Sequence, residues 1–456
     1  MGLPNILNYS IPVSGWNLHS LHLLINSFYL LTSLVWISEA TIIVFWYSST
    51  SKKNRRRGLL QRCLRCLRFT RPTSATHSAI RLEPKRQLPR CSLIVVAYLP
   101  NEQNIILDTL KHILMTIEKP QGGLEVILAY NSPVQLPVED DLKHLAALYP
   151  ELRLLHVKAS RSKAENLNAA IQIVTGEITG ILDADHRPVA DCLKRTWRWL
   201  ESDWYDVVQG RNVIRNHNYN LLTKIISVEF EFLYGVSHLG RSILLDTAIF
   251  GGSNGYWRTS VLHHLQFCPD MLTEDVDISM RTLLGGYRIV NDPTIISTEL
   301  APIDIQSLWF QQKRWIQGWL EVALKYQWLF WRSDKLDVWQ KLYWTMLLLY
   351  STGFFAVGLP ILLIISGLFF SNNSFPSQSH DYVWLMTVLS LVMELYQTLA
   401  VMKVKNSISR LCLSDLTLYW LFVPLSFVFK NIIIIAAIYD HLLGKTEWVI
   451  TRRAPN

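Results

Sequence analysis

Two aspartates separated by one residue, Asp183 and Asp185, follow a short apolar segment at 178–182. An apolar segment of this length is typical of a buried strand, and ligands of α/β sheets bind beyond the carboxyl ends of the strands. Two carboxylates at such an end can bind one hard divalent cation, because these ions prefer oxygen ligands. Taken alone, the pattern fits a turn or a helix cap better than a metal site. We interpret the neighbouring His186 as a loop residue.

Acidic residues also open a predicted helix over 271–281, with Thr273 at the N-cap and Glu274 and Asp275 in the first turn. A well-capped helix explains this pattern and is, for the segment alone, the better interpretation. A carboxylate at a helix entrance could equally be the general base that takes a proton from an acceptor hydroxyl. The segment alone leaves both interpretations open.

A third segment, 310–319, combines two cationic residues, Lys313 and Arg314, with several aromatic residues. Leu308, Trp315 and Trp319 recur at helical intervals, which predicts an amphipathic helix lying in the membrane interface. One interpretation is a membrane-surface anchor without a chemical role. The other is that the planar guanidinium of Arg314 binds a phosphate while Trp315 stacks on a sugar ring.

The elements that must position these residues form a predicted α/β domain between residue 90 and about residue 300. Apolar segments at 92–98, 124–130, 152–157 and 178–182 alternate with helical patterns. This alternation indicates βαβ units and a mostly parallel sheet that is buried on both faces. The polar residues just past each strand are therefore the candidate site residues.

Long apolar segments flank this domain. Half of the 456 residues are hydrophobic and only 18% are charged, which excludes an intrinsically disordered protein. Residues 21–47 carry Glu39 as their only charge and are long enough to span a bilayer. A cleaved signal peptide fits poorly, because the apolar segment is too long and no basic region precedes it. Segments at 343–370, 382–402 and 416–440 predict three further spans.

A strongly basic segment fixes the predicted topology. Residues 51–90 hold 13 Lys or Arg and one acid, within a chain of net charge +8. The positive-inside rule places this segment and the following domain in the cytosol. Attraction to anionic lipid explains the charge more simply than nucleic-acid binding does. Three C-terminal spans would place the tail outside, whereas Lys445, Arg452 and Arg453 favour the cytosol, so the number of spans stays open.

The predicted protein is thus a multi-pass membrane protein with an α/β cytosolic domain between an N-terminal transmembrane helix and a C-terminal transmembrane helical bundle. Its six predicted segments are an N-terminal segment with a transmembrane helix (1–50), a basic linker (51–89), the α/β domain (90–300), an amphipathic interface helix (301–335), transmembrane helices (336–443) and a tail (444–456).

The order of the motifs resembles that of the membrane-integrated family 2 glycosyltransferases, which include cellulose, hyaluronan and chitin synthases. The resemblance covers residues 90 to about 330 and implies a GT-A (Rossmann-like) fold, a cytosolic nucleotide-sugar donor and transfer with inversion. The six segments that carry it are Ala97-Tyr98-Leu99-Pro100-Asn101-Glu102, Lys163-Ala164-Glu165-Asn166-Leu167-Asn168, Asp183-Ala184-Asp185, Phe250-Gly251-Gly252-Ser253, Thr273-Glu274-Asp275 and Gln311-x-x-Arg314-Trp315.

The resemblance implies a role for each matching acidic residue. Asp183 would contact the nucleoside, and Asp185 would bind the Mg²⁺ or Mn²⁺ that bridges the diphosphate. Asp275 would be the general base, and Glu274 would shape the acceptor site. This division is chemically coherent, because a departing nucleotide diphosphate needs a metal and cations while a neutral hydroxyl needs a base.

The resemblance also divides the remaining residues between donor and acceptor. Lys163, Gln311 and Arg314 would face the donor diphosphate. The acceptor side would comprise Phe250, Gly251, Gly252 and Trp315. Asn131 stands where the family usually has an acidic residue after its second strand. Its amide oxygen can accept a hydrogen bond from uracil but adds no charge, and UDP remains the expected nucleotide.

The expected activity is metal-dependent transfer of a hexose from a UDP-sugar to a growing β-linked polysaccharide, because the Q-x-x-R-W motif accompanies processive synthesis in this family. Four or five spans make a small channel, so transfer of one or a few sugars to a membrane lipid is the alternative. A third possibility is a catalytically inactive membrane scaffold. Against it, an inactive protein has no physical need for Asp185, Asp275 and the Arg314–Trp315 pair. The expected partners are a nucleotide sugar, a glycan or lipid acceptor and the bilayer, but no nucleic acid.

Overall fold

The computed structural model describes residues 33–47, 86–349, 377–405 and 408–445. Most of the predicted basic linker, the tail beyond residue 445 and most of the predicted span at 343–370 lie outside the described residues. The α/β domain and the Q-x-x-R-W segment lie within them.

An eight-stranded sheet forms the centre of the molecule, in the order β3-β2-β1-β4-β7-β6-β8-β5. Strands β1, β2, β3 and β4 are mutually parallel, which confirms the prediction for 92–182. Antiparallel β7 then separates β4 from β6 and makes the sheet mixed. The strands are β1 (Cys91–Tyr98), β2 (Leu124–Asn131), β3 (Leu152–His156), β4 (Ile178–Asp183), β5 (Arg187–Pro188), β6 (Val207–Ile214), β7 (Gly255–Arg258) and β8 (Ile289–Glu299).

Both faces of the sheet are covered, as the continuous apolar character of its strands predicts. Leu93 and Val95 of β1 pack into one hydrophobic core, and Ile94 and Val96 pack into a second. The helices of the domain are α4 (Leu99–Glu102), α5 (Ile106–Thr116), α6 (Val138–Leu148), α7 (Lys163–Ile171), α8 (Cys192–Leu200), α9 (Leu221–Phe232), the π-helix η1 (Leu233–Ser237), α10 (His238–Leu245), α11 (Thr259–Leu265) and α12 (Glu274–Leu284).

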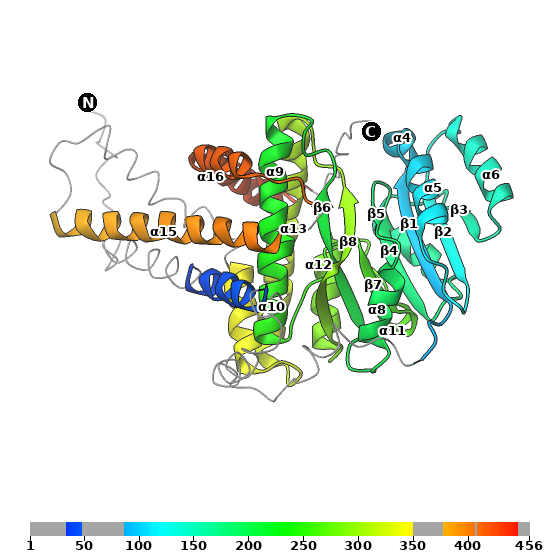
Figure 1. The fold of residues 1–456 in the computed structure, drawn as a ribbon, viewed down its shortest axis with the longest axis horizontal. Helices are drawn as coiled ribbons and strands as arrows, with labels where there is room; N and C mark the ends of the chain where they lie inside the picture. Colours follow the sequence, from blue (N-terminus) through cyan, green and yellow to red (C-terminus); the bar gives the residue numbers. More distant parts are fainter. Residues whose placement is uncertain (1–32, 48–85, 350–376, 406–407, 446–456) are drawn as a thin grey trace, which may run out of the picture.

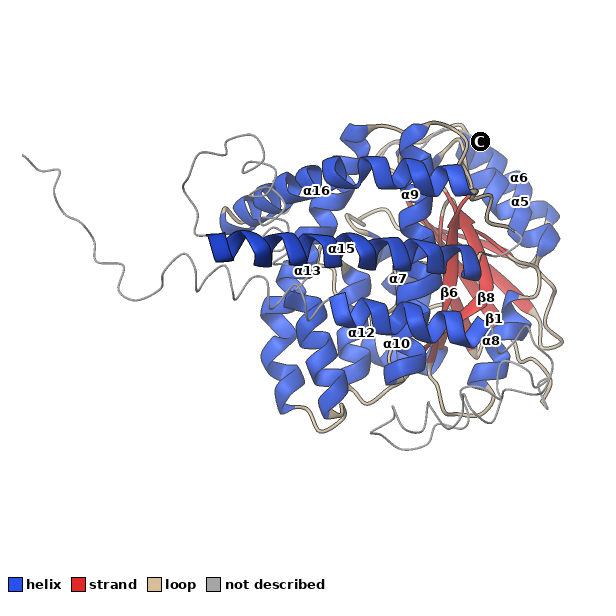
Figure 2. Cartoon of the chain, turned by 60° about the vertical axis from the view of Figure 1, so that its left-hand side comes forward, coloured by secondary structure: helices blue, strands red, loops and turns tan. Residues whose placement is uncertain are grey.

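Three long helices follow the domain: α13 (Ile305–Arg332), α15 (Ser377–Val404) and α16 (Leu413–Leu442). Figure 1 shows α15 and α16 on the opposite side of the molecule from α6, with α9 and α13 between them and the sheet. The two helices lie side by side (Figure 2), and Trp420 Nε1 of α16 donates to Thr398 Oγ1 of α15 at 3.1 Å. The C-terminal helices therefore pack on the β6 and β8 end of the domain.

The apolar helix Ser33–Tyr47 attaches to the domain through its one acidic residue. Glu39 is buried and accepts hydrogen bonds from Tyr343 Oη at 2.6 Å and Ser237 Oγ at 2.7 Å. Gly240 of α10 permits the close approach, because a Cβ there would lie 2.6 Å from Glu39 Cβ. The charge within the predicted span 21–47 is thus matched by polar partners from two other segments.

The predicted spans are supported only in part. Among the described residues, no single straight helix is both long and apolar enough to cross a bilayer. Two segments of α16, Leu413–Ser426 and Val428–Leu442, meet this requirement together, but the helix bends by 45° where they join. Pro424 lies inside α16, and proline removes a helical hydrogen bond and bends the helix. The sequence pattern at 416–440 predicts the helix but not its bend.

Candidate active site

The carboxyl ends of β1, β2 and β4 meet at one edge of the sheet. Tyr98 pairs with Asn131, and Val96 pairs with Asp183, so the polar residues that follow these strands share one edge. Helix α7 begins at this edge with Lys163, and Ser162 caps it by accepting a hydrogen bond from the backbone of Glu165 at 3.2 Å. The side chain of Lys163 is thus presented to the strand ends.

Lys163 joins three distant segments. Its Nζ lies 2.6 Å from Asp183 Oδ1 and 3.6 Å from Glu274 Oε1, and it donates to the carbonyl of Gly252 at 2.8 Å. Burial lowers the pKa of Lys163, but the charges of Asp183 and Glu274 outweigh burial and raise that pKa overall. The ammonium group therefore stays charged and holds the acidic residues of two motifs around it. The structure brings these predicted residues together, while their chemical roles stay predictions.

Asp275 lies next to this cluster, in the first turn of α12. Burial and the adjacent charge of Glu274 raise the pKa of Asp275 to about 7, against the opposing effects of Lys163, the backbone of Val276 and Arg314. A carboxyl group with this pKa exchanges protons near neutral pH, which suits a general base.

Gly252 allows the loop 250–253 to approach Asp275. Its φ is +84°, which favours glycine, and a Cβ there would lie 3.0 Å from Asp275 Oδ2. The next residue, Ser253, accepts a hydrogen bond from the backbone N–H of Asp183 at 2.9 Å. Phe250 does not fit the predicted acceptor role, because its ring is fully buried and packs edge-on against Trp257 at 5.3 Å. Gly252 and Ser253 of this motif therefore contact the acidic residues of the site, whereas Phe250 does not.

The T-E-D segment begins a helix with Thr273 at the N-cap position, as predicted. The side chain of Thr273, however, makes no capping hydrogen bond. Its buried Oγ1 has no hydrogen-bond partner among the described residues, and it packs against Gly318 of α13. The absence of a capping bond argues against the interpretation that this segment is only a well-capped helix.

Helix α13 carries the Q-x-x-R-W motif against α12. Asp277 is fully buried and accepts hydrogen bonds from Tyr326 Oη at 2.6 Å and Lys325 Nζ at 3.0 Å. Arg314 Nη1 donates to the carbonyl of Leu272 at 3.3 Å, just before the T-E-D turn. The motif thus adjoins the T-E-D turn. A pocket lies between α13, Leu272 and the end of α16, and neither Gln311 nor Trp315 lines it. That pocket is lined by Leu272, Phe310, Lys313, Arg314, Gln317, Asp440 and Lys445.

Asn131 is largely occupied by protein partners. Its Oδ1 accepts from Asn166 Nδ2 at 2.8 Å, and its Nδ2 donates to the carbonyl of Ser160 at 3.1 Å. One lone pair of the oxygen remains for a nucleotide base. These hydrogen bonds leave Asn131 less able to bind the donor nucleotide than the sequence predicts.

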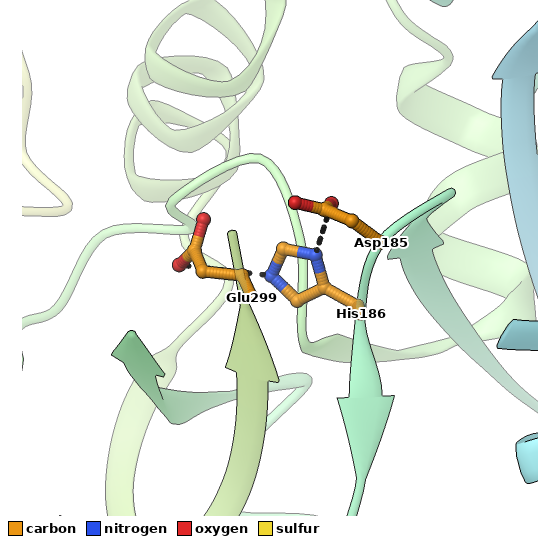
Figure 3. Close-up of side chains that lie close together, drawn as sticks. All are labelled: Asp185, His186 and Glu299. Atoms are coloured by element: carbon orange, nitrogen blue, oxygen red, sulfur yellow. Dashed lines mark hydrogen bonds and ion pairs between the residues drawn. The ribbon is translucent and has the colours of Figure 1, made fainter. Parts of the chain in front are cut away.

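Asp185 belongs to a second cluster that the sequence pattern does not predict. Its Oδ1 lies 3.2 Å from His186 Nδ1, and its Oδ2 accepts from the backbone N–H of Leu300 at 3.0 Å. His186 Nε2 lies 3.8 Å from Glu299 Oε1 at the end of β8. Figure 3 shows the imidazole between the two carboxylates. His186 lies in the loop between β4 and β5, as interpreted from the sequence, but its side chain is buried and only 1% exposed.

The second cluster fits a divalent cation. One atom from each of Asp185, His186 and Glu299 lies within 4.8 Å of the others. The buried Nε2 of His186 has no hydrogen-bond partner among the described residues, as expected of an atom kept for a ligand. Burial lowers the pKa of His186, but the charge of Glu299 and the hydrogen bond with Asp185 outweigh it and raise that pKa, so a metal ion that binds this ring must displace a proton. An oxygen, nitrogen and oxygen donor set suits Mn²⁺.

The sequence relationships agree with this geometry. Residues 178–401 match the family model described as "Glycosyl transferase family group 2". The probable glycosyltransferase YdaM of Bacillus subtilis is 24% identical over 326 residues, which are 70% of this chain and 76% of that protein. The poly-beta-1,6-N-acetyl-D-glucosamine synthase of Staphylococcus epidermidis is 26% identical over 56% of this chain and 60% of its own length.

Two further proteins extend the comparison. The probable glucomannan 4-beta-mannosyltransferase 2 of Oryza sativa is 29% identical over 196 residues. These residues are 42% of this chain and 33% of that protein. The mannosyltransferase PcManGT of Pyrobaculum calidifontis, solved with GDP-Man and Mn²⁺, has a TM-score of 0.56 at 18% identity. The match covers 92% of this chain and 100% of PcManGT, and it establishes the fold alone. Residues 178–401 are therefore similar to the group 2 glycosyltransferases, and the likeness to PcManGT shows a GT-A-like fold.

Proposed function

We propose that this protein is a membrane-bound, metal-dependent, inverting glycosyltransferase that transfers a hexose from a nucleotide sugar to a growing β-linked polysaccharide. The observation that carries the proposal is the cluster in which Lys163 contacts Asp183 and Glu274 beside Asp275. A nucleotide-sugar transferase needs these elements together: a cation near the leaving group and a base near the acceptor.

The proposed roles follow from the position of each group. Asp275 removes the proton from the acceptor hydroxyl, since the pKa of its carboxyl is raised to about 7. Lys163 holds Asp183 at the nucleotide side and presents positive charge to the donor phosphates. Arg314 adds a second cation from α13. Inversion is consistent with this set, because one base serves a single displacement at the anomeric carbon.

Asp185, His186 and Glu299 would hold the divalent ion. When bound, such an ion would neutralise charge on the departing nucleotide diphosphate. The Mn²⁺ in the solved complex of PcManGT supports this assignment by analogy of fold. We propose a UDP-sugar as the donor and Mg²⁺ or Mn²⁺ as the ion, although the GDP-Man bound by PcManGT and the occupied amide of Asn131 make GDP-mannose the first competitor to test.

Membrane integration is the second part of the proposal. It is supported by the apolar helix Ser33–Tyr47 and by the bent apolar pair in α16. Trp328, Trp331 and Trp339 are exposed near the end of α13, and tryptophan favours the membrane interface. The catalytic domain would then lie in the cytosol beside the bilayer.

The experiment incubates the purified full chain in lipid nanodiscs with radiolabelled UDP-glucose, UDP-N-acetylglucosamine or GDP-mannose and with Mg²⁺ or Mn²⁺. Long, protease-resistant polymer is the expected product. Short, solvent-extractable glycolipid would instead establish the lipid-acceptor alternative. No product from any donor, with a folded protein, would favour the inactive scaffold.

A further inference from the structure

A rare helical turn lies behind the proposed active site. Helices α9 and α10 are joined by the π-helix η1, Leu233–Ser237, whose second residue, Tyr234, is 5% exposed. Single π-helical turns within longer helices are uncommon and often mark functional sites. The ring of Tyr234 is fixed between Phe230, at a centroid distance of 5.8 Å, and His238, at 4.7 Å. Its hydroxyl is therefore held in one place.

That hydroxyl fills the space where a side chain at position 251 would lie. A Cβ on Gly251 would be 2.7 Å from Tyr234 Oη but 3.5 Å from the ring atoms Cε1 and Cζ. The backbone of Gly251 does not adopt a positive φ, unlike that of Gly252. The contact with the hydroxyl, rather than backbone conformation, is what excludes a side chain from this position.

The turn held by Tyr234 belongs to the site. The backbone N–H of Gly251 donates to Gln209 Oε1 at 2.9 Å, so the turn is fixed from a second side. One residue further on, the carbonyl of Gly252 accepts from Lys163 at 2.8 Å, and its Cα faces Asp275. A shift of this turn would therefore move the acceptor of Lys163 and the wall beside Asp275 together.

The electrostatic surroundings keep this hydroxyl neutral. Burial raises the pKa of Tyr234 well above its usual value, and the negative charges of Glu299, Asp275 and Asp183 raise it further. Burial and the charge of Arg241 hold the pKa of the neighbouring His238 well below its usual value. The hydroxyl is thus a neutral group of fixed shape beside charged neighbours.

We propose that Tyr234 is a positioning residue that sets the place of the Gly251–Gly252 turn and, through it, the relation of Lys163 to Asp275. This inference rests on the proposed function, because it assigns the turn to a transferase site. It predicts a specific coupling: a side chain at position 251 is harmful only while the hydroxyl at position 234 is present.

The test is a double-mutant cycle with Gly251→Ala, Tyr234→Phe and the double variant. We expect Gly251→Ala to lower kcat at least tenfold, and Tyr234→Phe to lower it two- to fivefold with little change in the KM for the donor. The double variant should recover most of the loss caused by Gly251→Ala. Tyr205→Phe is the matched control, because the Tyr205 hydroxyl contacts Asp246, away from the site, at 2.7 Å. Combined with Gly251→Ala, it should not restore the lost turnover.

Two results would overturn the inference: a double variant as impaired as Gly251→Ala, or equal recovery by Tyr205→Phe. Thermal unfolding midpoints keep the test separate from the proposed function. If the wild-type chain transfers no sugar, the proposed function fails, and the midpoints still decide the coupling. A double variant that melts above Gly251→Ala supports the positioning contact, and equal midpoints contradict it.

Discussion

Gly318 of α13 packs directly on Thr273 at the start of α12. A Cβ on Gly318 would lie 2.4 Å from Thr273 Cγ2 and 2.5 Å from its Oγ1. This contact joins the helix of the Q-x-x-R-W motif to the T-E-D turn, and Arg314 reaches the same turn one helical turn earlier. Helix α13 therefore packs on the T-E-D turn, which favours a role beyond that of a surface anchor.

Replacing Gly318 with alanine should push these helices apart. The added methyl group meets a buried threonine, and overpacking of this kind costs about 1–3 kcal/mol. We expect a lower unfolding midpoint and at least a tenfold loss of turnover, measured by calorimetry and radiolabel transfer. Leu324→Ala on an exposed part of the same helix, where the side chain is 67% exposed, should change neither. Equal effects of the two substitutions would exclude the proposed packing role.

The rate of sugar transfer should depend on the protonation of Asp275. Its pKa is raised to about 7, and a general base acts only when deprotonated. The kcat/KM for the donor, which reports the free protein, should therefore rise between pH 5.5 and 8.5, with a midpoint near 7. The measurement is a pH–rate profile at constant ionic strength. A rate that is flat across this range, or that falls from pH 6 to 8, would be inconsistent with Asp275 as the base.

Removing the charge of Lys163 should affect both stability and this profile. Lys163→Met leaves Asp183 and Glu274 without their shared cation. It should lower stability by less than the cost of breaking a fully buried ion pair, about 3–5 kcal/mol, because the side chains of Lys163 and Asp183 are partly exposed. Because Lys163 lowers the pKa of Asp275, its loss should move the midpoint of the pH–rate profile upward.

The matched control for this substitution is Lys143→Met. Lys143 lies 2.8 Å from Asp140 in an exposed ion pair, and exposed pairs contribute little to stability. It should leave the unfolding midpoint and the pH–rate profile unchanged. A downward shift of the profile in Lys163→Met would contradict the proposed electrostatic role.

Divalent cations should bind at the second cluster. Glu299→Gln should weaken Mn²⁺ binding at least tenfold, as measured by titration calorimetry in the absence of a nucleotide, because it removes a charged oxygen ligand. Chelation of the wild type should abolish transfer, and added Mn²⁺ should restore it. Asp334→Asn, at a side chain that is 85% exposed, is the control. Unchanged Mn²⁺ affinity in Glu299→Gln would place the ion elsewhere.

The elements of the domain could be predicted because their signals are local. The strands at 92–98 and 178–182 show continuous apolar character, and the helix that begins at Glu274 shows acidic residues in its first turn. The order of the motifs predicts that Lys163 and Asp183 share one site, and the structure brings Lys163 Nζ within 2.6 Å of Asp183 Oδ1.

The remaining features depend on tertiary packing. Glu299 lies near His186 because β8 pairs with β5. The two residues are far apart in the sequence, so the sequence pattern does not predict this contact. Phe250 was assigned to the acceptor by its place in a motif, yet its ring fills the core. The sequence does not predict the roles of Gly318 and Tyr234. Each role depends on a contact with a residue distant in sequence, Thr273 for Gly318 and Gly251 for Tyr234.

The central claim is that Asp275 activates an acceptor within a donor site assembled by Lys163. The most direct measurement compares turnover and nucleotide-sugar affinity in the wild type and in Asp275→Asn. The account predicts a loss of turnover of at least a thousandfold, with donor affinity within about threefold of wild type, since a base is needed for chemistry and not for donor binding. Near-normal turnover in Asp275→Asn would contradict it.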